Sequence, residues 1–322
     1  MSLIADALQP FVVKDLASVA GRMKIMTLPD SLIDPLAAYD LNFDNTQRTI
    51  IVDFRDTSAV ALALAADACR LSCAAFQTMV LASTEMLNRD SMAWSLVKLY
   101  YSAFYAGNAL IRLLGESCSY FDRQHISRLN QLAIALNRIP TFKIEGGLYR
   151  CVVDHTGTAL WCTRARGGIG GAHEAFWDIF GNRLGVLAME VLSGPLSTTD
   201  AQAVFTQIEQ FRDVLRQRIN HSWLSVVRNE LQYRHEYQVW FPAQLRARQR
   251  EALSRHSNRW SRDPMLIDLS KKGDVLSEFV ACCCFVVSLC NTMLARIAER
   301  SDVGSKSFIR LGPIAFLNDR AA

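Results

Sequence analysis

The sequence predicts a mainly α-helical protein, built as an antiparallel helical bundle with an inserted β-hairpin and a small N-terminal α/β cap. Half of the 322 residues are hydrophobic and 20% are charged, so the chain must bury a large core. Only 16 glycines and 8 prolines interrupt it, which favours long uninterrupted elements. Long runs rich in alanine and leucine, two residues of high helix propensity, indicate that those elements are helices.

We expect three parts along the chain. An N-terminal cap over 1–57 contains turn signals and the strand-like run Thr49–Phe54. A helical domain follows over 58–300, with a β-hairpin inserted at about 140–171, and a C-terminal tail covers 301–322. The chain length fits either two average domains or one large core with insertions.

The helices of the bundle are predicted from hydrophobic runs near 58–88, 91–114, 200–240 and 273–300. The last run holds an uncharged stretch, 279–295, that falls just short of the length of a membrane span. Because Glu278 and Arg296 flank it closely, we expect a buried helix and no membrane contact. The first residues lack the basic region of a signal peptide, so the expected location is the cytoplasm.

The hairpin is predicted from two strand-like runs, 149–153 and 159–163, that surround a turn at Asp154–Gly157. Counting outward from this turn places Cys151 opposite Cys162 in a hydrogen-bonded pair, where side chains are too far apart to favour a disulfide. The nine cysteines include no C-x-x-C pair, and their number is odd. We therefore expect reduced thiols, as in a cytoplasmic protein.

Several familiar catalytic motifs are missing from the sequence. It contains no G-x-x-x-x-G-K-[ST] phosphate loop, no H-E-x-x-H zinc helix and no G-x-S-x-G nucleophile elbow. These absences argue against the corresponding NTPases, zinc proteases and hydrolases, and we expect neither a metal nor a cofactor. The glycine run at 167–171 is either a flexible connector or a phosphate-binding loop before a helix, and the connector is favoured.

The most informative pair of residues is Arg228 and His235. If their segment is helical, seven residues separate them by about two turns, so both would project from one face. An arginine can hold phosphate oxygens in two places, and a histidine can transfer a proton near neutral pH. Together they are suited to phosphodiester cleavage, although a solvated charged face would have the same spacing.

Positive charge is concentrated around this pair. Residues 212–262 contain eleven arginines, no lysine and four carboxylates, for a net charge of +7 against +4 for the whole chain. Aromatic residues lie between the arginines, as expected of a surface that binds phosphates and stacks on unpaired bases. The expected RNA-contacting residues are Tyr233, Arg234, His221, Arg246, Arg248 and Arg250. A hydrophobic core with solvated arginines remains the alternative.

Arg228 and Asn229, followed by His235, resemble the R-x(4-6)-H motif of the HEPN superfamily. The aromatic-rich segment 94–106 is similar to the first helix of its bundles. The resemblance implies a metal-independent endoribonuclease in a prokaryotic defence or toxin-antitoxin system. It implies that Arg228, His235 and Asn229 are catalytic. Arg228 would stabilise charge on the phosphoryl oxygens, His235 would transfer a proton, and Asn229 would orient the phosphate or His235. It further implies a homodimer and an operon-encoded protein partner.

A second hypothesis belongs to a different class. Asn229 and Tyr233 also fit HEPN members that keep an R-N-x-x-x-Y pattern without demonstrated catalysis. The protein would then be a non-catalytic helical binding or scaffold protein, such as a sensor or an antitoxin-like partner. The two hypotheses differ in whether Arg228 and His235 share an open groove or are engaged in contacts within the chain.

Overall fold

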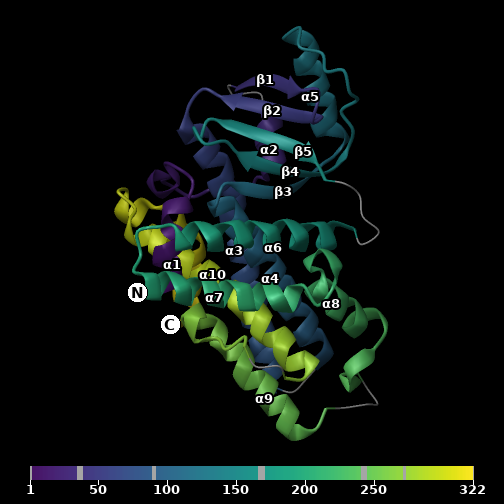
Figure 1. Ribbon diagram of the computed structural model, residues 1–322, viewed down its shortest axis with the longest axis vertical. Helices are drawn as coiled ribbons and strands as arrows, with labels where there is room; N and C mark the ends of the chain where they lie inside the picture. Colours follow the sequence, from purple (N-terminus) through teal and green to yellow (C-terminus); the bar gives the residue numbers. More distant parts are fainter. Residues whose placement is uncertain are drawn as a thin grey trace.

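The computed structural model describes residues 2–34, 39–88, 92–165, 171–240, 245–270 and 273–321. It has a large helical body with a five-stranded antiparallel sheet at one end (Figure 1). Helices account for about two thirds of the protein, so the prediction of a mainly helical fold is confirmed. The expected glycine run at 167–171 lies outside the described residues except for Gly171.

The sheet joins segments that the sequence assigned to separate parts. Its strands are β1 (Tyr39–Asp44), β2 (Thr49–Phe54), β3 (Glu116–Phe121), β4 (Gly147–Val153) and β5 (Ala159–Arg164). They are ordered β1-β2-β5-β4-β3, and every neighbouring pair is antiparallel. The pairing of β2 with β5 makes the expected cap and the hairpin insertion one structure, so they are not independent additions.

The predicted hairpin register is correct. Cys151 of β4 lies directly opposite Cys162 of β5. Both cysteines are fully buried, and all nine cysteines of the chain are free thiols. Burial and the neighbouring Cys151 raise the pKa of Cys162 well above its ordinary value, which keeps this thiol protonated.

Three long helices form the core of the helical body. They are α3 (Thr57–Asn88), α4 (Met92–Leu113) and α10 (Val275–Glu299), at the predicted positions. The short connection between α3 and α4 makes them antiparallel neighbours, and α10 packs mainly against α4. Long aliphatic, aromatic and cysteine side chains of α10, from Phe279 to Cys290, are almost entirely buried.

The expected helix over 200–240 is interrupted, so that prediction is wrong in its extent. The helix α7 (Thr198–Leu215) ends early, and α8 (Trp223–Tyr233) starts after a short 3-10 turn. Within that turn Asn220 and His221 both have positive φ, at 58° and 52°. A continuous α-helix cannot contain this left-handed backbone, so the chain changes direction here.

Six further helices complete the described part of the fold. They are α1 (Leu3–Leu8), α2 (Leu28–Ile33), α5 (Arg123–Ala135), α6 (Gly171–Leu192), α9 (Ala247–Ser257) and α11 (Ala315–Ala321). In Figure 1, α5 and α2 lie behind the sheet, whereas α9 lies at the far end of the helical body. The segment 301–322 is expected as a tail, but its described part is packed onto the body, since Phe308 and Ile309 are buried.

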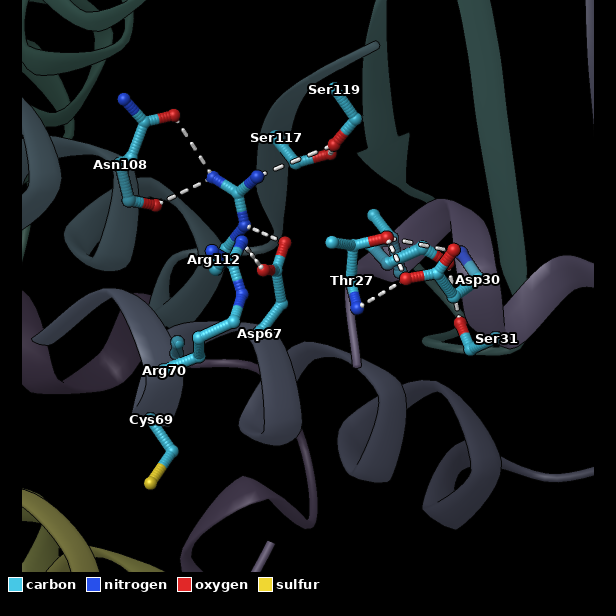
Figure 2. Close-up of polar contacts among 12 residues, drawn as sticks. Thr27, Asp30, Ser31, Asp67, Cys69, Arg70, Asn108, Arg112, Ser117 and Ser119 are labelled. Carbon is cyan, nitrogen blue, oxygen red and sulfur yellow. Dashed lines mark hydrogen bonds and ion pairs between the residues drawn. The ribbon is translucent and has the colours of Figure 1, made fainter. Parts of the chain in front are cut away.

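A buried polar network connects the helices to the sheet (Figure 2). Arg112 of α4 donates from Nε to Asp67 of α3, and from Nη1 to the backbone oxygen (2.8 Å) and Oδ1 (3.1 Å) of Asn108. Its Nη2 donates to Ser119 of β3 at 3.3 Å. Burial alone would raise the pKa of Asp67, but the charges of Arg112 and Arg70 hold it below its ordinary value.

Two helices are long and apolar enough to cross a membrane by length and composition alone. They are the part of α3 over Thr57–Met86, and α10. In the most apolar window of each helix, 67% and 72% of the residues are buried inside the fold. Their apolar surface is therefore largely used for packing within this chain.

Candidate nucleic-acid interface

The segment expected to carry Arg228 and His235 on one face does not remain helical. Arg228 lies within α8, but this helix ends at Tyr233, and His235 has a left-handed φ of 55°. Side-chain contacts bring the following chain back onto the helix: Trp240 donates from Nε1 to the backbone oxygen of Leu231 at 2.6 Å, and the Tyr237 hydroxyl donates to Glu230. These tertiary contacts end the helix before His235, so the expectation of a common helix face is wrong.

Arg228 is buried against aromatic rings of α4. Its side chain belongs to a residue that is only 6% exposed, and its guanidinium carbon lies 5.1 Å from the ring centroid of Tyr100 and 5.8 Å from that of Tyr101. The Nη1 group approaches Gln232 Oε1 at 3.5 Å, whereas Nε has no hydrogen-bond partner. Within the described residues no carboxylate forms an ion pair with it.

Tyr100 connects Arg228 to α6. The Tyr100 hydroxyl accepts a hydrogen bond from Trp177 Nε1 at 3.1 Å and lies 2.9 Å from His173 Nδ1. Because the indole can only donate, the hydroxyl is the acceptor of that bond. Burial raises the pKa of Tyr100 to about 12, so this hydroxyl stays protonated. Arg228, Tyr100, His173 and Trp177 thus form one connected cluster between α4, α6 and α8.

His173 is neutral at physiological pH. Burial, with a further contribution from the Arg228 charge, lowers the pKa of His173 to about 4. A neutral imidazole carries one proton, on Nδ1 or on Nε2, so His173 can donate to or accept from the Tyr100 hydroxyl. The sequence does not indicate that His173, Tyr100 and Trp177 come together, because nothing in the local spacing shows that α4 and α6 meet there.

The other expected catalytic residues lie elsewhere. Asn229 is exposed on α8, and His235 is exposed with its ring centroid 5.1 Å from that of Trp240. Trp240 in turn meets Trp94 of α4 edge-on at 5.5 Å. The structure therefore brings Arg228 together with buried aromatic residues, and His235 together with tryptophans nearer the surface.

The six expected RNA contacts also separate into groups. Tyr233 is 68% exposed, and Arg234 is an exposed neighbour at the end of α8. His221 is largely buried, with its Nδ1 at 3.1 Å from Asp178 Oδ1. Its ring packs so closely on Gly181 of α6 that a Cβ there would lie 2.7 Å away, which explains the glycine. His221 thus contacts the protein interior more than solvent.

The remaining three expected contacts lie on or beside α9. Arg246 and Arg248 are exposed and Arg250 is half-buried. With three further arginines of the same segment they make up what we call the arginine surface, a name for the arginines of residues 246–262: Arg246, Arg248, Arg250, Arg255, Arg259 and Arg262. Within the described residues none of these guanidinium groups is paired with a carboxylate.

The helical periodicity divides the arginines of α9 between two sides, because Arg250 projects from nearly the opposite side to Arg248. Arg248 and Arg255 are seven residues apart in α9, so they project from the same side of the helix. Glu251 is the single carboxylate of residues 245–262, which leaves a net charge of +5 over that segment. An extended anion such as a nucleic-acid strand would meet several unpaired cations here.

No group of three or more His, Cys, Asp or Glu side chains with metal-binding geometry occurs in the described parts of the chain. No protein-family model matches the chain. Neither a curated protein nor a solved structure matches it significantly.

Proposed function

We propose that this protein is a helical, HEPN-like RNA-binding protein that does not cleave RNA through Arg228 and His235. The arginine surface carries this proposal: six guanidinium groups lie on α9 and in the segments directly before and after it, with no carboxylate partner among the described residues. Unpaired cations clustered along one element are the electrostatic basis of nucleic-acid binding. We place the protein in a prokaryotic defence system because Arg228, Asn229 and His235 resemble the HEPN motif in sequence.

Two placements favour binding over cleavage. A catalytic arginine must reach the phosphoryl oxygens, but Arg228 is buried and covered by Tyr100 and Tyr101. A general acid or base must act on the same phosphate, but His235 lies beyond the end of α8 and contacts Trp240. The two groups are thus engaged separately within the chain, which is the arrangement expected for the binding hypothesis.

The test is binding of a fluorescein-labelled uridine 12-mer to the full chain in EDTA. We expect saturable binding without cleavage, and at least tenfold weaker binding after Arg246→Gln, Arg248→Gln and Arg255→Gln are combined. The matched control combines Arg22→Gln, Lys24→Gln and Arg123→Gln, which removes three exposed positive charges elsewhere. If both triple variants bind equally, or wild-type protein does not bind, the proposal is wrong.

A further inference from the structure

A cavity of about 390 Å³ opens at the end of the arginine surface. It lies between α7, the segment after α9 and the first turns of α10, and Arg259 forms part of its wall. Val214, Ile267, Ala281 and Cys282 contribute apolar walls, whereas Asp268, Ser277 and Glu278 contribute polar ones. A cavity of this size can hold a small ligand.

Glu278 presents a fixed carboxylate to this cavity. Its Oε1 accepts a hydrogen bond from the backbone N–H of Gly273 at 3.0 Å, and its Oε2 accepts one from Gln217 Nε2 at 3.3 Å. No described cation forms an ion pair with it. Because each carboxylate oxygen can accept more than one hydrogen bond, Glu278 keeps capacity for donors on a ligand.

Arg259 and His256 line the same cavity. Arg259 is half-buried and, like Glu278, has no partner of opposite charge among the described residues. Burial, together with the charges of Arg259 and Arg255, lowers the pKa of His256, so its imidazole is neutral at pH 7. An imidazole ring is a surface on which an unpaired base can stack.

The chemistry of these walls favours one base. Glu278 requires adjacent N–H donors, and Arg259 requires acceptors at another edge of the ligand. Guanine has both, with N1–H and N2–H₂ on one edge and O6 and N7 as acceptors. Uracil has a single N–H donor between two acceptors, and adenine lacks the paired donors. We propose that this cavity binds a guanine base of the single-stranded RNA that lies on the arginine surface, an inference that rests on the proposed function.

The test compares two labelled RNA 12-mers, one of uridines alone and one with two isolated guanines, bound to full-length protein in EDTA. We expect the guanine-containing RNA to bind at least fivefold more tightly. Glu278→Gln should abolish this preference, because the amide introduces donors where the carboxylate accepted. Glu251→Gln, which removes an exposed carboxylate from α9, should keep the preference.

A second variant guards against local misfolding of Glu278→Gln. Ala281→Leu keeps every polar wall but reduces the space, so it should also remove the guanine preference. In wild-type protein, 5′-GMP should displace the guanine-containing RNA at concentrations where 5′-AMP and leucine do not. Equal binding of both RNAs, a preference that survives both variants, or displacement by leucine would overturn the inference. Binding of neither RNA would instead refute the proposed function, and the inference with it.

Discussion

The guanidinium of Arg228 lies 5.1 Å from the centre of the Tyr100 ring, in the contact between α8 and α4. The hydroxyl of the same tyrosine forms a hydrogen bond with His173 and accepts another from Trp177. A motif that resembles a nuclease centre in sequence is therefore part of the packing between three helices. This relationship makes the role of Arg228 testable by stability measurements.

Arg228→Ala should destabilise the protein by about 1–3 kcal/mol, since it removes the cation–π contacts and leaves a space beneath Tyr100. Arg228→Met should cost less, within about 1 kcal/mol of wild type, because it fills the space without burying an unpaired charge. Urea unfolding followed by circular dichroism measures both values, and exposed His235→Ala is the control with little effect. The nuclease hypothesis would be supported instead by a different result. In that case the protein cleaves RNA without a metal, and Arg228→Ala and His235→Ala each abolish this cleavage without changing stability.

The pKa of His173 predicts a pH dependence of stability. The folded value of about 4 lies below the ordinary value of 6.5, so the unfolded chain binds more protons between these limits. The unfolding free energy is therefore unaffected by His173 above about pH 6.5 and falls as the pH decreases towards 4. His173→Phe should flatten the slope of unfolding free energy between pH 6.5 and 4.5. A variant with the same slope as wild type would show that His173 is not the group responsible.

RNA binding by the arginine surface should depend steeply on salt. Each phosphate neutralised on a single strand contributes about −0.7 to the slope of log affinity against log salt concentration. Combining Arg246→Gln, Arg248→Gln and Arg255→Gln should therefore reduce the magnitude of the slope by about 2. Titrations of the uridine 12-mer at several salt concentrations measure it. An unchanged slope would indicate that these three side chains do not contact phosphates.

The ion pair between Asp67 and Arg112 predicts a large effect of a single substitution. Arg112 is 4% exposed and Asp67 is fully buried, so Arg112→Met leaves a buried carboxylate with only Arg70 nearby. We expect a loss of about 3–5 kcal/mol, measured by urea unfolding. Combining it with Asp67→Leu should recover at least half of the loss, because no buried charge remains. Equal destabilisation in the single and double variants would contradict this account.

The sequence by itself determined the local elements. Helix propensity and the scarcity of glycine placed α3, α4 and α10, because these signals act within a few turns of one segment. The same local reasoning placed β2 and the hairpin, including the register of Cys151 against Cys162. It also located the excess of arginine that became the arginine surface, since net charge along a segment is a property of the sequence.

The tertiary structure decided everything that depends on which segments meet. The pairing of β2 with β5 and the addition of β3 joined distant segments into one sheet, which no local pattern encodes. The contact of Trp240 with Leu231 fixed the end of α8, and the meeting of α4 with α6 placed Tyr100 beside His173. Burial and partners are properties of such long-range contacts. The motif suggested that Arg228 is a cation at the surface. Arg228 is buried, because its surroundings come from residues far away in the chain.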